Sequence, residues 1–168
     1  MNMKKNQKPT QTLDPKTTIG HIHLKVADLE RSVKFYRDVL GFEVMTRIGN
    51  KAAFLSAGGY HHHIGLNTWE SANGNPPPQG STGLYHFAIL VSNRKELAKV
   101  FKRLMKHNYP IDGASDHGVS EAIYLKDPDG NGIEIYSDRP RNKWPKDSKG
   151  DVEMLTKRLD IDNLMKEL

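Results

Sequence analysis

Apolar and polar residues alternate along several short stretches of the chain, and a helical pattern follows the first of them. Residues 19–26 (IGHIHLKV) alternate as a strand does, because successive side chains of a strand point to opposite faces. Apolar residues then recur at helical spacing over residues 29–40, between Asp28 as an N-cap and Gly41 as a terminator. Glycine and asparagine separate three further predicted strands, at residues 42–48, 52–56 and 61–68. The pattern predicts a β-α-β-β-β unit.

The second half of the chain repeats this order of elements. Asn93, with Glu96 three residues later, resembles a capping pair at the start of a helix that ends near residue 108. A looser loop is expected after this helix. Residues 127–132 (DPDGNG) carry the proline, glycine and asparagine of a tight turn between the last two strands. The predicted strands of this unit span residues 84–91, 121–126 and 132–137.

These two units predict an α+β fold and a division of the chain. Residues 1–17 are expected to be a disordered leader, because they are rich in lysine, asparagine, glutamine, threonine and proline. Residues 18–140 are expected to form one domain, with units at 18–70 and 83–138 and a proline-rich loop between them. Residues 141–168 are expected to be a tail that contains a helix, which we interpret as a packing or dimer-contact element.

The repeat places four positions in equivalent pairs. His21-Ile22 aligns with His86-Phe87, and Ile64-Gly65-Leu66 aligns with Ile133-Glu134-Ile135. Two units paired about a pseudo-twofold axis would bring these positions together across one cleft. His21, His86 and Glu134 are then a two-histidine, one-carboxylate set, which suits a non-heme Fe(II) that binds substrate and O₂ together. A lone strand histidine is more often packed or at the surface, but here spacing, chemistry and symmetry agree.

Other polar residues are candidates for the same cleft. By strand alternation from Gly65, His61 and His63 face the cleft and His62 faces away. His63 is a candidate acid-base group, and the alternative is a polar strand edge. Tyr124 either packs, as Phe54 would in the other unit, or hydrogen-bonds a substrate oxygen near the metal.

Composition narrows the class without naming an activity. The 168 residues include no cysteine, which excludes a disulfide scaffold, thiolate zinc sites and a cysteine nucleophile. No apolar run has the length of a membrane span, and no signal peptide is present, so we expect a cytoplasmic protein. The net charge of +5 owes much to four lysines before residue 17. The sequence has no basic patch with stacking aromatic residues, so it does not indicate nucleic-acid binding.

The motifs resemble those of the vicinal oxygen chelate superfamily over residues 18–140. They are HIHLKV with DLERSVKFYRDVLGFEV, then GLYHFAIL, then YLKDPDGNGIEIY, in the family's order and spacing. The resemblance implies two βαβββ units paired into a cupped, half-barrel mixed sheet with helices outside. It also implies that His21, His86 and Glu134 bind the metal and that Tyr124 lies beside the substrate. His117 lies near the place where ring-cleaving members carry a further histidine, although the intervening loop looks shorter here.

Within the superfamily, GYHHHIGLNTW and YSDRPRNKWP look most like the catechol 2,3-dioxygenase-like proteins of bacilli. That likeness implies an Fe(II) extradiol dioxygenase acting on an aromatic diol and O₂, in a domain of a kind that often forms homodimers. Glyoxalase I usually has a fourth ligand, a glutamate, where Gly65 stands. Two alternatives remain open: a Lewis-acid isomerase or thiol transferase using Mn(II), Zn(II) or Ni(II), and a non-enzymatic module that binds an aromatic compound or antibiotic.

Overall fold

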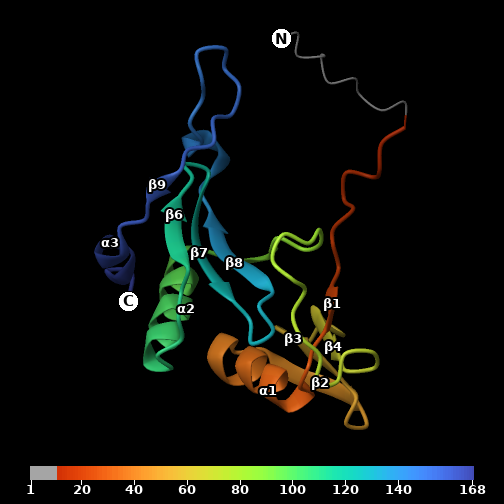
Figure 1. Cartoon of the computed structure of the whole chain (residues 1–168). Helices are drawn as coiled ribbons and strands as arrows, with labels where there is room; N and C mark the ends of the chain where they lie inside the picture. The colour runs from red at the N-terminus through yellow and green to blue at the C-terminus, as the bar shows by residue number, and fades with distance from the viewer. Residues whose placement is uncertain (1–10) are drawn as a thin grey trace.

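Two mixed sheets, each with helices against it, make up the computed structural model, which describes residues 11–168 (Figure 1). The expected disorder of the leader falls largely on residues outside this range. The two sheets do not join into one: each ends in a strand, β1 or β5, that has a partner on one side only among the described residues. No helix in residues 11–168 is long and apolar enough to span a membrane.

The first unit has the predicted order of elements. Asp28 caps the first helix by accepting a hydrogen bond from the Arg31 backbone N–H at 3.0 Å, and Gly41 ends it in the left-handed region with φ of +92°. The second half of this helix is π-helical, and strand β1 is shorter than expected. The elements are β1 (Ile22–Lys25), α1 (Leu29–Lys34), η1 (Phe35–Leu40), β2 (Glu43–Ile48), β3 (Ala52–Ser56) and β4 (Ile64–Asn67), with sheet order β1-β4-β3-β2.

The second unit repeats the first and adds one strand, β9 (Lys157–Arg158), to its far edge. Asn93 accepts a hydrogen bond from the Glu96 backbone N–H at 3.0 Å, which confirms the predicted cap. The segment expected to be a loop before residue 121 forms a strand, because its backbone pairs antiparallel with the following strand. The elements are β5 (Phe87–Leu90), α2 (Arg94–Lys106), β6 (Gly113–Asp116), β7 (Ser120–Lys126) and β8 (Gly132–Asp138), with sheet order β5-β8-β7-β6-β9.

Strand register reproduces the alignment of the two units. Ile22 lies opposite Ile64 in the parallel pair β1–β4, and Phe87 lies opposite Ile133 in the parallel pair β5–β8. Phe54 lies opposite Gly65 as Tyr124 lies opposite Glu134. Equivalent positions therefore occupy equivalent places on the two sheets.

The C-terminal tail is mostly extended rather than helical. It contains η2 (Arg141–Lys143), β9 (Lys157–Arg158) and the five-residue helix α3 (Ile161–Met165). The extended part follows β6, because the Leu155 and Leu159 backbone N–H groups donate to the carbonyls of His117 and Ala114. α3 packs against α2 through Leu164, whose side chain is fully buried (Figure 1). Residues 152–168 therefore run along the outer edge of the second sheet, and we call this segment the strap.

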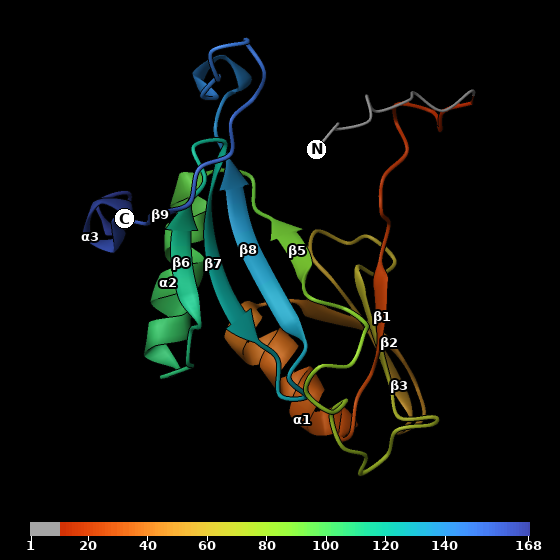
Figure 2. The same ribbon diagram turned by 45° about the horizontal axis from the view of Figure 1, so that its top comes forward.

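The β7–β8 turn of the second unit packs against helix α1 of the first and holds the two units together (Figure 2). The Tyr36 hydroxyl, fully buried, donates to the Asp127 carboxylate at 2.9 Å. Asp129 in the same turn accepts from the Ala27 backbone N–H and the Ser32 hydroxyl. Burial, and then the adjacent Asp127 carboxylate, raise the pKa of Tyr36 far above its usual value, so the phenol remains a donor.

We expect Tyr36→Phe to lower the free energy of unfolding by about 1.5–3 kcal/mol, because a buried carboxylate loses a hydrogen bond. Urea denaturation followed by circular dichroism measures the change. Tyr85→Phe removes a hydroxyl from a side chain that is 90% exposed and serves as the control. Equal stabilities of the two variants would show that this bond does not hold the units together.

Candidate functional site

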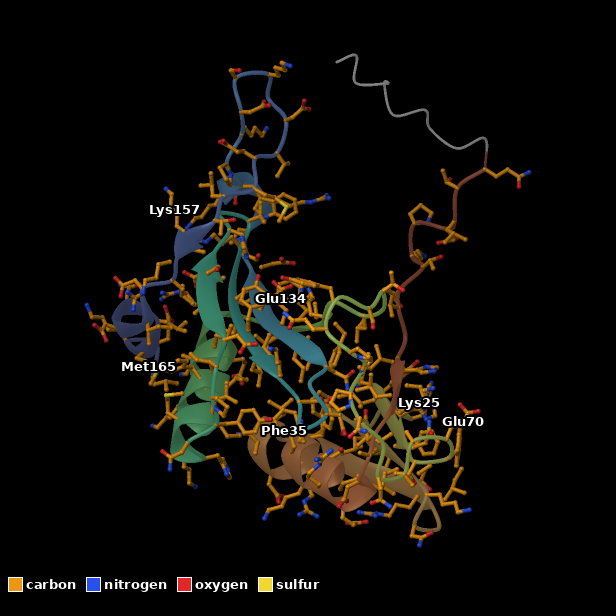
Figure 3. The ribbon with its side chains drawn as sticks, in the orientation of Figure 1. Lys25, Phe35, Glu70, Glu134, Lys157 and Met165 are labelled. Atoms are coloured by element: carbon orange, nitrogen blue, oxygen red, sulfur yellow. The ribbon has the colours of Figure 1, made fainter. Side chains whose placement is uncertain are left out.

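Glu134 on β8 and His86, just before β5, form a close pair on one face of the second sheet. Their Oε2 and Nε2 atoms are 3.0 Å apart, and both side chains are partly buried. In the parallel pair β5–β8, Ala88 lies opposite Glu134. His86 is two residues before Ala88, so its side chain points to the same face of the sheet as the side chain of Glu134. Figure 3 shows Glu134 along the middle of β8. The pair brings together two of the three predicted metal ligands.

Tyr124 on β7 lies directly across from Glu134 and contacts its second oxygen. The Tyr124 hydroxyl is 3.1 Å from Glu134 Oε1 and 2.7 Å from Nε2 of His117. Burial, and then the Glu134 carboxylate, raise the pKa of Tyr124 to about 12, so the phenol is protonated at neutral pH. Tyr124 thus connects the carboxylate to an imidazole and does not merely pack.

His117 belongs to this network through both of its ring nitrogens. Nε2 is 2.7 Å from the Tyr124 hydroxyl, and Nδ1 is 2.7 Å from the backbone carbonyl of Leu155 in the strap. The short turn between β6 and β7 brings His117 back over Tyr124. The four side chains therefore form one continuous path, His86–Glu134–Tyr124–His117. Leu155 could not be found from the sequence, because the contact uses its backbone.

The third predicted ligand, His21, has different neighbours. Its ring packs on His62, with ring centroids 4.4 Å apart, and His62 also contacts Phe54. The prediction that His62 faces away is wrong, because β4 begins only at Ile64 and strand alternation does not extend back to residue 62. Burial lowers the pKa of His62, and His21 adds to this shift. The lowered pKa favours the neutral form of the His62 imidazole.

His23 occupies the space above Gly65, which the sequence alone left empty. A Cβ atom at residue 65 would lie only 3.0 Å from Cγ of His23. Sequence reasoning missed His23, although its two-residue spacing from His21 places both on one strand face. An acidic side chain at residue 65 would therefore displace this imidazole.

His63 lies apart from the path through Tyr124. Its Nδ1 is 3.0 Å from the hydroxyl of Ser56, which is buried, and its ring stacks near Tyr60. An acid-base role for His63 stays a prediction.

A cavity of about 1050 Å³ separates the edges β1 and β5. His21 and His63 lie on one wall and His86 on the other, while Arg103 of α2 and Phe42 are also part of its lining. Within residues 11–168, no three histidine or acidic side chains are close enough to hold one metal ion. One chain therefore places His86 and His21 on different sides of this cavity, and Glu134 contacts His86 without lining the cavity itself.

The donor atoms of His86 and Glu134 fit a divalent ion. Two ligands with metal bonds of about 2.0–2.2 Å lie about 3 Å apart around one ion, which agrees with their 3.0 Å separation. Tyr124 orients the carboxylate from its other oxygen, as outer partners of metal ligands commonly do. The pair supplies two ligands of a site that needs at least one more.

Curated relatives of this chain include enzymes that act on different substrates. It is 45% identical over 152 residues to a catechol-2,3-dioxygenase of Bacillus subtilis, covering 90% of this chain but 52% of that protein. A metallothiol transferase FosB of Lysinibacillus sphaericus is 30% identical over 122 residues, covering 71% and 82%. A manganese-dependent 2,3-dihydroxybiphenyl 1,2-dioxygenase of Geobacillus genomosp. 3 is 30% identical, covering 77% and 39%. The chain spans about half of the first relative, and two of these names include a metal.

The fold is also found among solved structures. A glyoxalase/dioxygenase from Nostoc punctiforme superposes with a TM-score of 0.63 at 21% identity, covering 79% of this chain and all of that one. The family model for the Glyoxalase/Bleomycin resistance protein/Dioxygenase superfamily matches residues 18–135. That range contains the first βαβββ unit, the second as far as the middle of β8, the His86–Glu134 pair and the turn between β7 and β8. The chain belongs to the Glyoxalase/Bleomycin resistance protein/Dioxygenase superfamily.

Proposed function

We propose that this protein is a divalent-metal enzyme, with Fe(II) as the favoured metal, that cleaves the ring of a catechol-type substrate with O₂ beside a hydroxyl. The observation that carries the proposal is the His86–Glu134 pair, with Tyr124 and His117 hydrogen-bonded in line behind it. This arrangement joins a cation site to groups that can hold and move a proton. The 45% identity to a catechol-2,3-dioxygenase supports the same reaction class.

The proposed metal is held by His86, Glu134 and His21, and when bound it supplies a centre at which a diol and O₂ meet. Tyr124, protonated because its pKa is about 12, hydrogen-bonds a substrate hydroxyl and can pass its own proton to His117. His117 accepts the phenol proton at Nε2 as Tyr124 takes a proton from the substrate hydroxyl. The net charge of the phenol stays constant through this exchange.

A Lewis-acid thiol transfer using Mn(II), Zn(II) or Ni(II) is the second candidate. One observation favours it: the chain is 30% identical over 122 residues to a metallothiol transferase FosB. A glyoxalase-like site with four protein ligands is disfavoured, because His23 fills the space above Gly65. A binding module without chemistry would not need the aligned Tyr124 and His117.

We further propose that a second copy of the chain supplies His21. The hydrogen bond from Tyr36 to Asp127 holds the two units together. Closing the cavity within one chain would move the units relative to each other, so this bond opposes closure. Edges β1 and β5 both lack a second neighbour among the described residues. In a twofold dimer, β1 of each copy can lie beside β5 of the other, which brings His21 to the partner's pair twice.

Protein reconstituted anaerobically with Fe(II) should consume O₂ when mixed with a panel of catechols, with matching absorbance of ring-opened product. His86→Ala and Glu134→Ala should retain less than about a tenth of the wild-type iron, because each removes a ligand. His107→Ala, which removes an exposed imidazole at the end of α2, is the matched control.

Stoichiometric iron in Glu134→Ala would refute the ligand assignment. Bound iron without O₂ uptake would instead favour thiol transfer, which an assay with Mn(II), a thiol and an electrophilic substrate would then test.

The shared site can be tested by mixing two inactive chains, His21→Ala and Glu134→Ala, and refolding them together. Random pairing makes half of the dimers mixed, each with one intact site, so about a quarter of the wild-type metal content and activity should return. Sites built within one chain would regain neither, and this result would exclude the second copy as the source of His21.

Tyr124→Phe should keep the metal and lower kcat by about 100-fold or more, because a positioned proton donor is lost. Tyr136→Phe changes a neighbouring phenol on the same face of β8 and should have little effect. A Tyr124→Phe enzyme with wild-type kcat on an identified substrate would rule out the proposed role of this phenol.

A further inference from the structure

We propose that the strap, residues 152–168, is a positioning element that fixes the tautomer of His117 and so sets the direction of proton transfer from Tyr124. The catalytic use of this device rests on the proposed function, whereas the tautomer itself does not. The evidence lies in the two contacts of one imidazole ring, with Leu155 and Tyr124, and in how the strap is held.

A backbone carbonyl can only accept a hydrogen bond. Leu155 O is 2.7 Å from Nδ1 of His117, so this nitrogen must carry the proton. In the neutral ring Nε2 is then a bare acceptor, 2.7 Å from the Tyr124 hydroxyl. The opposite tautomer would place two acceptors 2.7 Å apart at Leu155, which costs electrostatic energy.

The tautomer decides where the single phenol proton goes. The Tyr124 oxygen has two acceptors in reach, Nε2 of His117 at 2.7 Å and Oε1 of Glu134 at 3.1 Å. With Nδ1 protonated, the phenol can give its one proton either to Oε1 of Glu134 or to the nearer Nε2 of His117. With Nε2 protonated, it would receive from His117 and donate to Glu134, and His117 could accept nothing from the substrate side. When the phenol proton moves to Nε2, the O–H bond breaks, an N–H bond forms, and the imidazolium keeps its Nδ1–H bond to Leu155 O.

The strap is anchored at several points beyond Leu155. Leu159 is 3% exposed and Leu164 is fully buried. Arg94 of α2 donates to the Glu167 carboxylate at 2.8 Å and to the Asn163 side chain at 2.8 Å. Figure 3 places Lys157 and Met165 along this segment, at the outer edge of the sheet that carries Glu134. These contacts keep the backbone carbonyl of Leu155 in place. The side chain of Leu155 takes no part in the contact with His117.

The test is the tautomer of His117, read from the nitrogen chemical shifts of the metal-free, full-length chain labelled with ¹⁵N-histidine, at about pH 8 where most imidazoles are neutral. The resonance is assigned by its loss in His117→Gln. In the wild type we expect more than about nine-tenths of the Nδ1–H form. A wild-type ring protonated at Nε2 would overturn the proposal.

Leu159→Asp should release the strap and lower the Nδ1–H fraction to about a half or less, since Nδ1 then has no fixed acceptor and the Tyr124 hydroxyl can pair with either form of Nε2. Met154→Asp, at a side chain 70% exposed in the same segment, is the matched control and should keep the wild-type tautomer. Leu155→Pro provides a second release if Leu159→Asp does not fold, because it deletes the N–H that donates to the His117 carbonyl. A single Nδ1–H form in variants whose strap amides exchange freely would refute the proposal. Absence of catechol cleavage would leave this test unaffected.

Discussion

The hydrogen bond from the buried Tyr36 hydroxyl to Asp127 is the contact on which the arrangement of the two units depends. A carboxylate out of water is stable only when donors surround it. Asp127 receives, besides the phenol, the backbone N–H groups of Asp129 and Asn131 and the Asn131 side chain. The same bonds shape the β7–β8 turn and attach it to helix α1. The turn that starts β8, and so positions Glu134, is therefore also the joint between the units.

This joint has a consequence for the candidate site. It holds His21 of the first unit and His86 of the second apart, on different sides of one cavity, and among the described residues the edge strands β1 and β5 each have a partner on one side only. A single chain is thus well built for proton handling, through Tyr124 and His117, but has only two of the three expected metal ligands together. The proposed second copy, related by a twofold axis, would supply the third ligand and pair both strand edges.

The surroundings of Gly65 and of Glu134, which are equivalent positions in the two units, differ. Gly65 is the position at which a fourth ligand would stand, and His23 covers it here. On the other unit, the equivalent strand carries Glu134, and Tyr124 across from it connects to His117 and the strap. At equivalent places, the first unit therefore carries imidazole and aromatic rings, whereas the second carries a carboxylate that is connected through Tyr124 to His117.

Local patterns in the sequence were sufficient for the repeated unit, its caps, its strand register and the pairing of Glu134 with His86, because alternation and helical spacing act over a few residues. The sequence also predicted the short turn between the strands of Tyr124 and Glu134, but only the structure shows that the two residues lie opposite each other. It could not locate β6, the extended strap, the contact of His62 with His21 or the cover that His23 provides over Gly65. Those features are decided by which backbones and rings meet in space, through hydrogen bonds and packing between residues far apart in the chain. The role of Leu155 is the clearest case, because a backbone carbonyl has the same chemistry at every residue and only the tertiary structure can direct it to His117.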